Sequence, residues 1–388
     1  MNKILLATSA LVGAVSLYAG AAMAAGPEVT VGGFLNFQVG HSSQKDSYET
    51  GNYSRKTHFL NDTEIHVKVD GKTDNGIGYG GVIELNADVT EDGDSDGVNA
   101  DKTFLFVDTA WGRGEFGNMS GAEHILKVDA STFARATGGI DGDWYYYANV
   151  QPGTNAYPFS GVADGNYIIH PDLPSQHEKS DTEDATKISY YTPRIAGFQA
   201  GVSYTNDQGD AGTAAGFSAN DDSFQYHNVW SGGVNYTGQF SDVGVAASLT
   251  GETGKDENND TRSLKAWAAG ANVSYMGFTV GGSYGDWNKS QIVDAPAFNG
   301  LDANYWTLGG AYAFGPAAVS VTYLDSEYAD SAGFNNNFQN LVLGADYQLA
   351  PGFVPYVEVS FFNTKTDANG AGGDNDGSVW LAGTELTF

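Results

Sequence analysis

Short segments in which apolar and polar residues alternate follow one another along nearly the whole chain. In the first clear example, Val29, Val31 and Leu35 fall on one face of an extended strand. Asn36 and Gln38 fall on the opposite face. A period of two residues is typical of a β-strand with one apolar and one polar face. The pattern therefore predicts an all-β protein.

The alternation predicts sixteen strands, and their connections are alternately short and long. Gly71–Gly76, Gly277 and Gly315–Pro316 are short, whereas Glu91–Asp101 and Asp207–Asp222 are long and acidic. A β-sandwich has no reason to keep tight turns at one end and long loops at the other, but a membrane barrel does. The expected strands span 28–41, 58–70, 77–89, 102–111, 114–119, 186–193, 197–206, 223–237, 243–252, 262–276, 278–287, 303–314, 317–326, 338–349, 353–364 and 378–388.

Strands that face lipid must close into a barrel, because each unpaired N–H or C=O group in hydrocarbon costs several kcal/mol. Only 41% of the residues are hydrophobic, which by itself would suggest a water-soluble protein. A transmembrane barrel escapes this inference, since only every second residue of a strand faces lipid. We therefore expect a transmembrane antiparallel β-barrel.

The N-terminus has the pattern of a cleavable export signal. Lys3 gives a small positive start, 4–22 is apolar and uncharged, and small residues occupy 22 and 24. This order predicts cleavage after residue 24. The alternative, a retained membrane anchor, would need different flanking residues. We expect 1–24 to be a signal peptide and 25–388 to form the barrel.

Composition excludes several classes of function. The chain has 47 Asp and Glu against 18 Lys and Arg, which gives a formal net charge of −29. Such an acidic chain is a poor partner for nucleic acid and is not drawn to anionic lipid by charge. It has no cysteine, so disulfides and thiolate chemistry are excluded. It also contains no HExxH or P-loop motif, and we expect neither an enzyme nor a bound cofactor.

Several local motifs, in their order and spacing, resemble the general porins of Gram-negative outer membranes, in particular the alphaproteobacterial type. They are VGGFLNF at 31–37, DGKTDNG at 70–76, WGRGEFGNM at 111–119, KISYYTP at 187–193 and the terminal Phe388. The resemblance covers the whole chain after the signal. It implies a sixteen-stranded barrel, usually a homotrimer, in contact with outer-membrane lipid and lipopolysaccharide. It also implies that Phe388 serves as an assembly signal.

The family's third outer loop folds into the lumen and narrows it, and its counterpart here is 120–185, far longer than the other connections. The stretch 149–179, rich in Pro, Gly and Asn, departs from the family pattern. Loop acids facing basic wall residues would create a transverse field across the constriction. The alternative is that these are ordinary solvated charges. The candidate constriction residues are Glu123, Asp129, Asp141, Asp143 and Arg135 on the loop, and Lys68 and Lys102 on the wall.

Two further motifs admit a functional and a structural interpretation. Asp92, Asp94 and Asp96 match the first half of a calcium-binding loop. Thr103 stands where a bidentate Glu is required, so we expect at most weak Ca²⁺ binding. The aromatic run Trp144–Tyr147 could stack on sugars, or it could hold the loop against the barrel wall. The second interpretation is favoured, because a sugar slide needs aromatic residues spaced along the whole path.

Three functional hypotheses follow. The first is a passive channel for small hydrophilic solutes and ions, with a moderate preference for cations because the chain is so acidic. The second is a substrate-selective channel with a saturable site for sugars or cations. The third is a soluble secreted β-protein such as a lectin or adhesin. The export signal, the alternation and the resemblance together favour the first.

Overall fold

The computed structural model describes residues 26–49, 55–87, 99–148, 167–176, 182–183, 185–209, 226–257, 261–292, 302–329, 335–366 and 374–388. The expected signal peptide, 1–24, lies outside this part of the chain. Among the described residues, no helix is long and apolar enough to cross a membrane.

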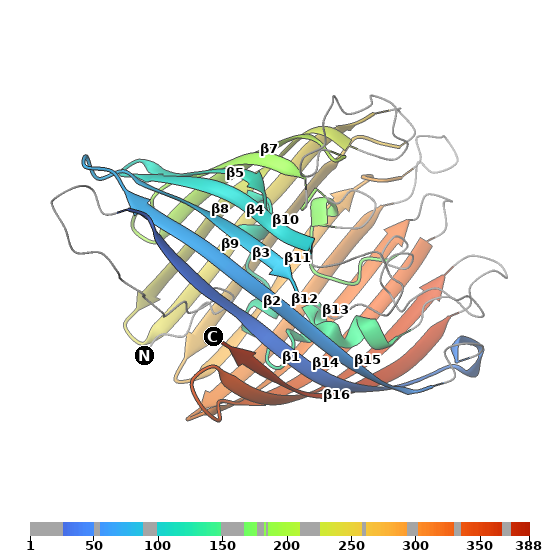
Figure 1. Ribbon diagram of the computed structural model, residues 1–388. Helices are drawn as coiled ribbons and strands as arrows, with labels where there is room; N and C mark the ends of the chain where they lie inside the picture. Colours follow the sequence, from blue (N-terminus) through green and yellow to red (C-terminus); the bar gives the residue numbers. More distant parts are fainter. Residues whose placement is uncertain are drawn as a thin grey trace.

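Sixteen β-strands close into one antiparallel barrel (Figure 1). Their ends differ from those expected from the alternation by at most four residues. The expectation of a sixteen-stranded barrel is therefore confirmed. The strands are β1 Glu28–Gln44, β2 Thr57–Lys72, β3 Gly78–Asn86, β4 Asn99–Thr109, β5 Gly112–Asn118, β6 Thr186–Tyr191, β7 Phe198–Asp207, β8 Tyr226–Phe240, β9 Val243–Asp256, β10 Lys265–Tyr275, β11 Phe278–Asn288, β12 Ala303–Phe314, β13 Ala317–Ala329, β14 Asn335–Tyr347, β15 Phe353–Thr366 and β16 Asn375–Thr387.

The barrel closes where its first and last strands pair. β1 and β16 run side by side in Figure 1, with Leu35 opposite Leu386 in the register. Beyond this ladder, the Gly33 N–H donates to the Phe388 carbonyl at 3.1 Å, and the Phe388 N–H donates to the Gly33 carbonyl at 3.1 Å. The last residue is thus part of the closure, which leaves no unpaired sheet edge at this seam.

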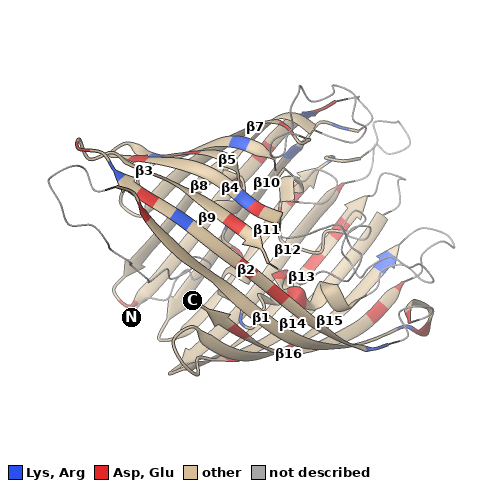
Figure 2. Ribbon diagram, viewed as in Figure 1, with Lys and Arg blue, Asp and Glu red and all other residues tan. Residues whose placement is uncertain are grey.

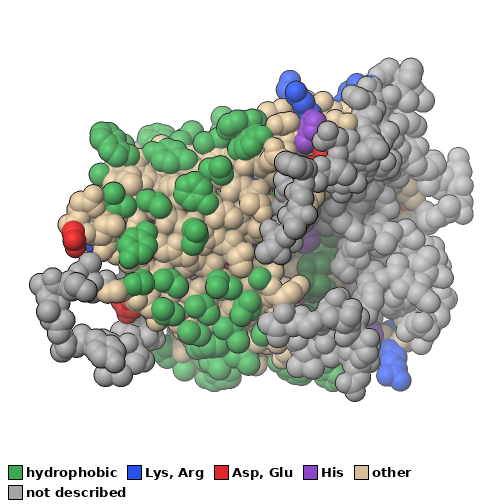
Figure 3. Space-filling model, turned by 45° about the horizontal axis from the view of Figure 1, so that its top comes forward, with side chains coloured by type: hydrophobic (Ala, Val, Ile, Leu, Met, Phe, Trp, Pro, Cys, Tyr) green, Lys and Arg blue, Asp and Glu red, His purple; other side chains and the backbone are tan. Residues whose placement is uncertain are grey.

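The outer surface of the barrel is an apolar band. Figure 3 shows hydrophobic side chains spread over the strands on the face in view, with coloured charged side chains at the two ends. Leu249, Val280 and Leu308 are 59%, 58% and 56% exposed, although each lies within a strand. An outward-facing apolar band of this kind is typical of a barrel surrounded by membrane hydrocarbon.

Aromatic side chains form a girdle at each edge of the band. Trp230, Trp267 and Trp306 are exposed near the strand ends that join the long connections, whereas Phe240 and Phe314 are exposed next to the short turns. Such rings are favoured at the two membrane–water interfaces.

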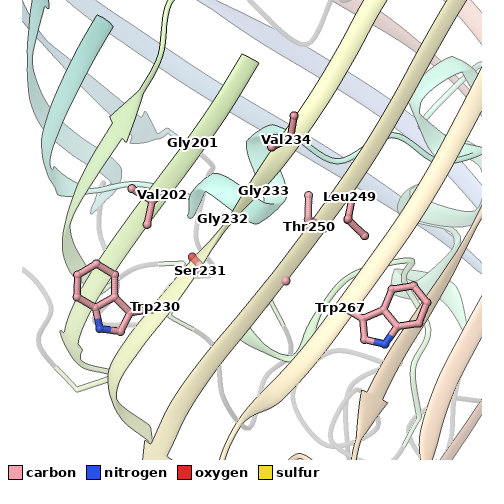
Figure 4. Close-up of a pocket in the computed structure, with 11 residues that line it drawn as sticks. Gly201, Val202, Trp230, Ser231, Gly232, Gly233, Val234, Leu249, Thr250 and Trp267 are labelled. Carbon is pink, nitrogen blue, oxygen red and sulfur yellow. The ribbon is translucent and has the colours of Figure 1, made fainter. Parts of the chain in front are cut away.

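A groove of about 520 Å³ lies on the outer surface between Trp230 and Trp267 (Figure 4). Gly232 and Gly251, two of its lining residues, have no side chain to fill it. The exposed rings of Trp230 and Trp267 place this groove on the lipid side of the wall, outside the lumen.

The short connections are tight turns, as expected. Between β10 and β11 only Met276 and Gly277 intervene, with φ angles of 47° and 87°. Two consecutive residues with positive φ make the turn whose twist matches that of the paired strands, and this explains the glycine. Of the long connections, the third is the one described in most detail, and it turns back into the barrel.

The described part of this third connection contains short helical turns inside the ring of strands (Figure 1). They are α1 Ala122–Ile125, η3 Ser131–Phe133, η4 Gly139–Asp141, η5 Asp143–Tyr147 and η7 Pro174–Gln176. The protein's main apolar core lies between this loop and the inner wall, where Ile140, Trp144 and Ile168 pack with Tyr305 and Phe338. The expectation of an in-folded third loop is therefore confirmed.

Candidate functional site

Backbone groups of the loop are fixed by side chains of the inner wall. The Ala122 N–H donates to Ser203 Oγ of β7 at 2.9 Å, and the Val128 N–H donates to Ser248 Oγ of β9 at 2.9 Å. Arg135 N–H donates to Ser320 Oγ of β13, also at 2.9 Å. Small hydroxyl side chains therefore hold the loop close to the wall, because their short reach matches a backbone lying directly on the sheet.

A buried wall carboxylate binds the middle of the loop. Glu358 of β15 is 1% exposed and accepts a hydrogen bond from Thr137 Oγ1 at 2.8 Å and another from the Gly139 N–H at 3.3 Å. Next to this contact, the Arg135 guanidinium lies 3.7 Å from the Asp346 carboxylate on β14. Arg135, a candidate constriction residue, is thus a link between the loop and the wall.

Trp144, in the aromatic run, anchors the loop. Trp144 is 0% exposed and stacks on Phe338 and Phe362, with ring centroids 5.5 Å and 6.3 Å away. Its indole N–H donates to the Ile140 carbonyl at 3.4 Å. Both faces of the ring are shielded, so Trp144 has no surface for stacking on a sugar.

The part of the unusual stretch 149–179 that the structure describes, 167–176, also lies on the inner wall. Tyr305 Oη donates to the Pro171 carbonyl at 2.9 Å, and Ser326 Oγ donates to the Ile168 carbonyl at 2.7 Å. This segment therefore extends the loop's attachment to β12 and β13.

A charge cluster at the centre of the loop places one lysine among three of its acids. Lys127 Nζ lies 2.5 Å from Asp172, 3.5 Å from Asp129 and 3.5 Å from Asp141. His170 Nδ1 lies 3.0 Å from Asp141 on its other side. Burial alone would raise the pKa of Asp141 and of Asp172, but Lys127 and the neighbouring His124 and His170 together outweigh it and hold both pKa values below their ordinary range. At Asp129 burial dominates and raises the pKa.

The remaining loop candidates lie between the loop and the wall, where Glu123 is buried and Asp143 is half-buried. Glu123, on α1, is 2% exposed and accepts hydrogen bonds from Ser175 Oγ at 3.1 Å and Gln176 Nε2 at 3.4 Å. Asp143, at the start of η5, accepts a hydrogen bond from Gln38 Nε2 of β1 at 2.6 Å. Burial raises the pKa of Asp143 to about 6. A constriction role for these two residues stays a prediction.

The wall opposite the loop is formed by β2–β5. The loop's helical turns pack on β6–β9 and on β12–β16 and β1, which leaves this sector facing the lumen. Figure 2 shows basic and acidic positions beside one another on β2 and β4. Lys68 Nζ lies 3.1 Å from Asp70, and Arg113 lies 3.1 Å from Asp108 and 2.6 Å from Glu115.

Lys102 connects this wall to the end of the loop. Its Nζ lies 3.4 Å from Glu183 of the loop, 3.1 Å from Asp101 and 3.7 Å from Glu84 of β3. The structure thus brings a predicted wall residue, Lys102, against the loop. Lys68 does not reach the loop in any described contact, and its ammonium lies 5.9 Å above the Phe106 ring instead.

Residues 7–385 match the model of a family described as Gram-negative porin. The chain belongs to this family. A porin is an outer-membrane channel for small solutes, and the closed barrel with a loop folded into its lumen has the architecture that such a channel requires.

Relatives of this porin share its length but little of its sequence. It is 27% identical over 419 residues to an uncharacterized protein of Rickettsia bellii, with 93% of each chain covered. It is also 27% identical over 130 residues to outer membrane porin F of Escherichia coli, which covers 31% of this chain and 36% of that one.

Two solved structures share its fold. A mutant of the Rh. blastica porin superposes with a TM-score of 0.58 at 17% identity, covering 93% of this chain and all of the other (100%). An anion-selective porin from Comamonas acidovorans superposes with a TM-score of 0.60 at 15% identity, with the same coverage of 93% and 100%. At these identities the likeness concerns the fold alone.

Some candidate residues fall outside the described part of the chain, among them Asp92, Asp94 and Asp96, so weak Ca²⁺ binding there stays a prediction. Conversely, sequence reasoning did not single out Glu84 and Glu358 as site residues. Alternation places Glu84 on the inner face. Its position next to Lys102 depends on the register between β3 and β4, where a bulge occurs between Ile83 and Leu85.

Proposed function

We propose that this porin is a passive diffusion channel for small hydrophilic solutes and ions, with a moderate preference for cations. The observation that supports this most directly is the charge balance around Lys102. This ammonium group meets three carboxylates, those of Glu84, Asp101 and Glu183. The base at the junction of loop and wall is therefore outnumbered by acids, and the local field favours cations.

Two other bases of the facing wall have acidic partners in the same way. Lys68 pairs with Asp70, and Arg113 pairs with both Asp108 and Glu115. An anion-selective pore needs basic groups that remain uncompensated along the path. In the part of the lumen wall that the structure describes, these three basic side chains all have acidic partners within 4 Å.

The preference should be moderate, because distance and salt limit the reach of the remaining charge. Exposed charges lose their influence beyond about 10 Å at 0.1 M salt and about 3 Å at 1 M. Acids on the outer loops therefore contribute less than the few carboxylates at the constriction. The fold alone does not determine whether a porin prefers cations or anions, since a porin named as anion-selective has the same architecture.

A saturable sugar site is the less supported alternative. Its best candidate, Trp144, is buried by stacking on the wall and has no free face. We therefore favour diffusion without a binding step. Family members form channels, and we propose no catalytic reaction.

We also propose that the porin is a homotrimer. β5 and β6 contain 7 and 6 residues, whereas a tilted strand needs about 9–11 residues to cross the hydrocarbon core. Their outward side chains include Phe116 and Ile188, which are 45% and 57% exposed. Packing this short side of the barrel against another copy would shield it from a mismatched bilayer.

The selectivity proposal is tested by reversal potentials of single charge variants in planar bilayers under a KCl gradient. Lys102→Met removes the cation and leaves its three carboxylates, so the preference for K⁺ should increase. Lys45→Met is the control, because Lys45 forms an exposed pair with Asp376 at the rim and should change the potential little. An unchanged or more anion-selective Lys102→Met channel would overturn the proposal. A conductance that rises linearly with salt concentration and does not change when sugars are added would support free diffusion over a binding step.

A further inference from the structure

Three potential metal ligands lie together on the inner wall, in the sector that faces the loop. Glu64 and His66 are two residues apart on β2, so their side chains leave the same face of the strand. Glu84 lies on β3 directly opposite His66 in the antiparallel register. Side chains directly opposite each other on one face are the closest neighbours in a sheet. The barrel's register therefore brings the three groups together.

The distances fit a site that a small cation can close. His66 Nε2 lies 2.7 Å from Glu64 Oε2, and one ligand atom from each of the three residues lies within 4.8 Å of the other two. Zn²⁺ binds imidazole nitrogen and carboxylate oxygen at about 2.0–2.2 Å, so ligands of one ion are roughly 3–4 Å apart. A small movement of the flexible Glu84 carboxylate is enough to reach this spacing. The imidazole is oriented by Phe34, whose ring meets it edge-on with centroids 6.3 Å apart.

The site is open to the water of the lumen. The side chains of His66, Glu64 and Glu84 are 17%, 22% and 23% exposed, so an ion can enter and can complete its coordination with water. Two carboxylates supply the negative charge. The imidazole favours a transition ion such as Zn²⁺, Co²⁺ or Ni²⁺ over Ca²⁺ or Mg²⁺, which prefer oxygen alone.

One neighbouring charge opposes binding. Lys102 Nζ lies 3.7 Å from the Glu84 carboxylate and 3.4 Å from Glu183 of the loop. It competes with the metal for Glu84 and should keep the affinity modest, as a channel requires if the ion is to leave again. Because Lys102 contacts both Glu84 and the loop, the site is one side chain away from the loop, where the lumen is narrowed.

We propose that Glu64, His66 and Glu84 bind a divalent transition-metal ion on the lumen wall, and that the bound ion obstructs the K⁺ current. The obstruction rests on the proposed channel function, whereas the binding itself does not. The positive ion occupies space beside the constriction and cancels the carboxylates that attract K⁺. The channel is thereby both a path and a weak, reversible binding site for such metals.

The test adds ZnCl₂ to single channels of the whole protein in planar bilayers, after the K⁺ conductance has been recorded in EDTA. We expect a submillimolar, saturable loss of current that EDTA reverses. His66→Gln should raise the ZnCl₂ concentration that gives half of this loss by at least about tenfold, since even changes outside the ligand sphere cost 10–100-fold in metal affinity. Lys102→Met should lower this ZnCl₂ concentration, because the competing ammonium group is gone. His41→Gln is the matched control, because His41 is an exposed histidine of β1 that bonds Thr57 instead.

Isothermal calorimetry of Zn²⁺ with the detergent-solubilised porin measures binding without relying on current. One saturable ion per chain, weakened by both His66→Gln and Glu64→Gln, supports the site. Zinc binding that is absent, or equal in the wild type and both variants, overturns it. The conductance in EDTA shows whether each variant has folded and inserted. A wild-type protein that binds zinc but conducts no K⁺ would refute the channel proposal and leave the metal site intact.

Discussion

Lys127 is the side chain on which the loop's charge cluster depends, and replacing it with methionine should loosen the loop. Methionine keeps most of the length and the apolar stem but removes the ammonium group. Three carboxylates, those of Asp129, Asp141 and Asp172, would then share a buried pocket without the cation that lies 2.5–3.5 Å from them. His170 and Ser131 would remain partners of Asp141, and His124 would remain 3.3 Å from Asp172.

The expected cost follows from burial. The side chains of Lys127, Asp172 and Asp129 are 13%, 12% and 1% exposed, so little solvent screens the carboxylates once Lys127 is gone. Removing one partner of a buried ion pair typically costs about 3–5 kcal/mol. We expect a loss in this range near pH 7, equivalent to a factor of about 100 or more in the folding equilibrium.

The loss of stability in Lys127→Met should increase with pH. In the wild type, Asp141 and Asp172 have lowered pKa values, so their stabilisation is present at neutral pH and disappears only on strong acidification. Without Lys127, burial raises these pKa values, and the folded state then prefers the protonated acids. The defect of Lys127→Met should therefore grow as the pH rises from 5 to 8.

Urea unfolding in lipid vesicles, followed by tryptophan fluorescence, measures this difference. Lys45→Met serves as the control, because Lys45 and Asp376 are 42% and 60% exposed and such pairs contribute about 1 kcal/mol or less. If Lys127→Met unfolds at the same urea concentration as Lys45→Met, or if its defect shrinks with rising pH, the cluster does not hold the loop as argued.

Three further predictions use the same protein. Because burial raises the pKa of Asp143 to about 6, the wild type should gain stability as the pH falls from 7 to 5, and Asp143→Asn should lose that dependence in the urea assay. Trp144→Ala should cost about 3–5 kcal/mol and increase open-channel noise, because it empties the stacked contact with Phe338; a quiet, fully stable variant would contradict the anchoring role. Light scattering in detergent should give the mass of three chains, and a monomer mass would rule out the trimer.

Alternation made the barrel predictable from the sequence. Ile65, Val67 and Val69 alternate with Glu64 and His66, and this period fixes both the strand and the face that each side chain occupies. Tight turns such as Met276–Gly277 then limit where a strand ends. Both signals are local, so they can be recognised in the sequence without knowing which strands are neighbours.

The contacts inside the lumen were less predictable, because they depend on register and on the course of the loop. Lys102 and Phe106 share parity, so alternation alone does not decide which side of their strand faces the lumen. In the structure the Phe106 ring is buried beneath Arg113, whose guanidinium lies 3.9 Å from the ring centroid. No local pattern indicates that Lys102 would meet Glu183, which follows it by about eighty residues in the chain.

The reversal potential of the wild-type channel in a KCl gradient tests the central claim most directly. We expect a sign that reports a preference for K⁺ and a magnitude that falls as the mean salt concentration rises, because the carboxylates around Lys102 are screened. A potential of the opposite sign would show that Lys68, Lys102 and Arg113 control the pore despite their acidic partners, and would contradict the account.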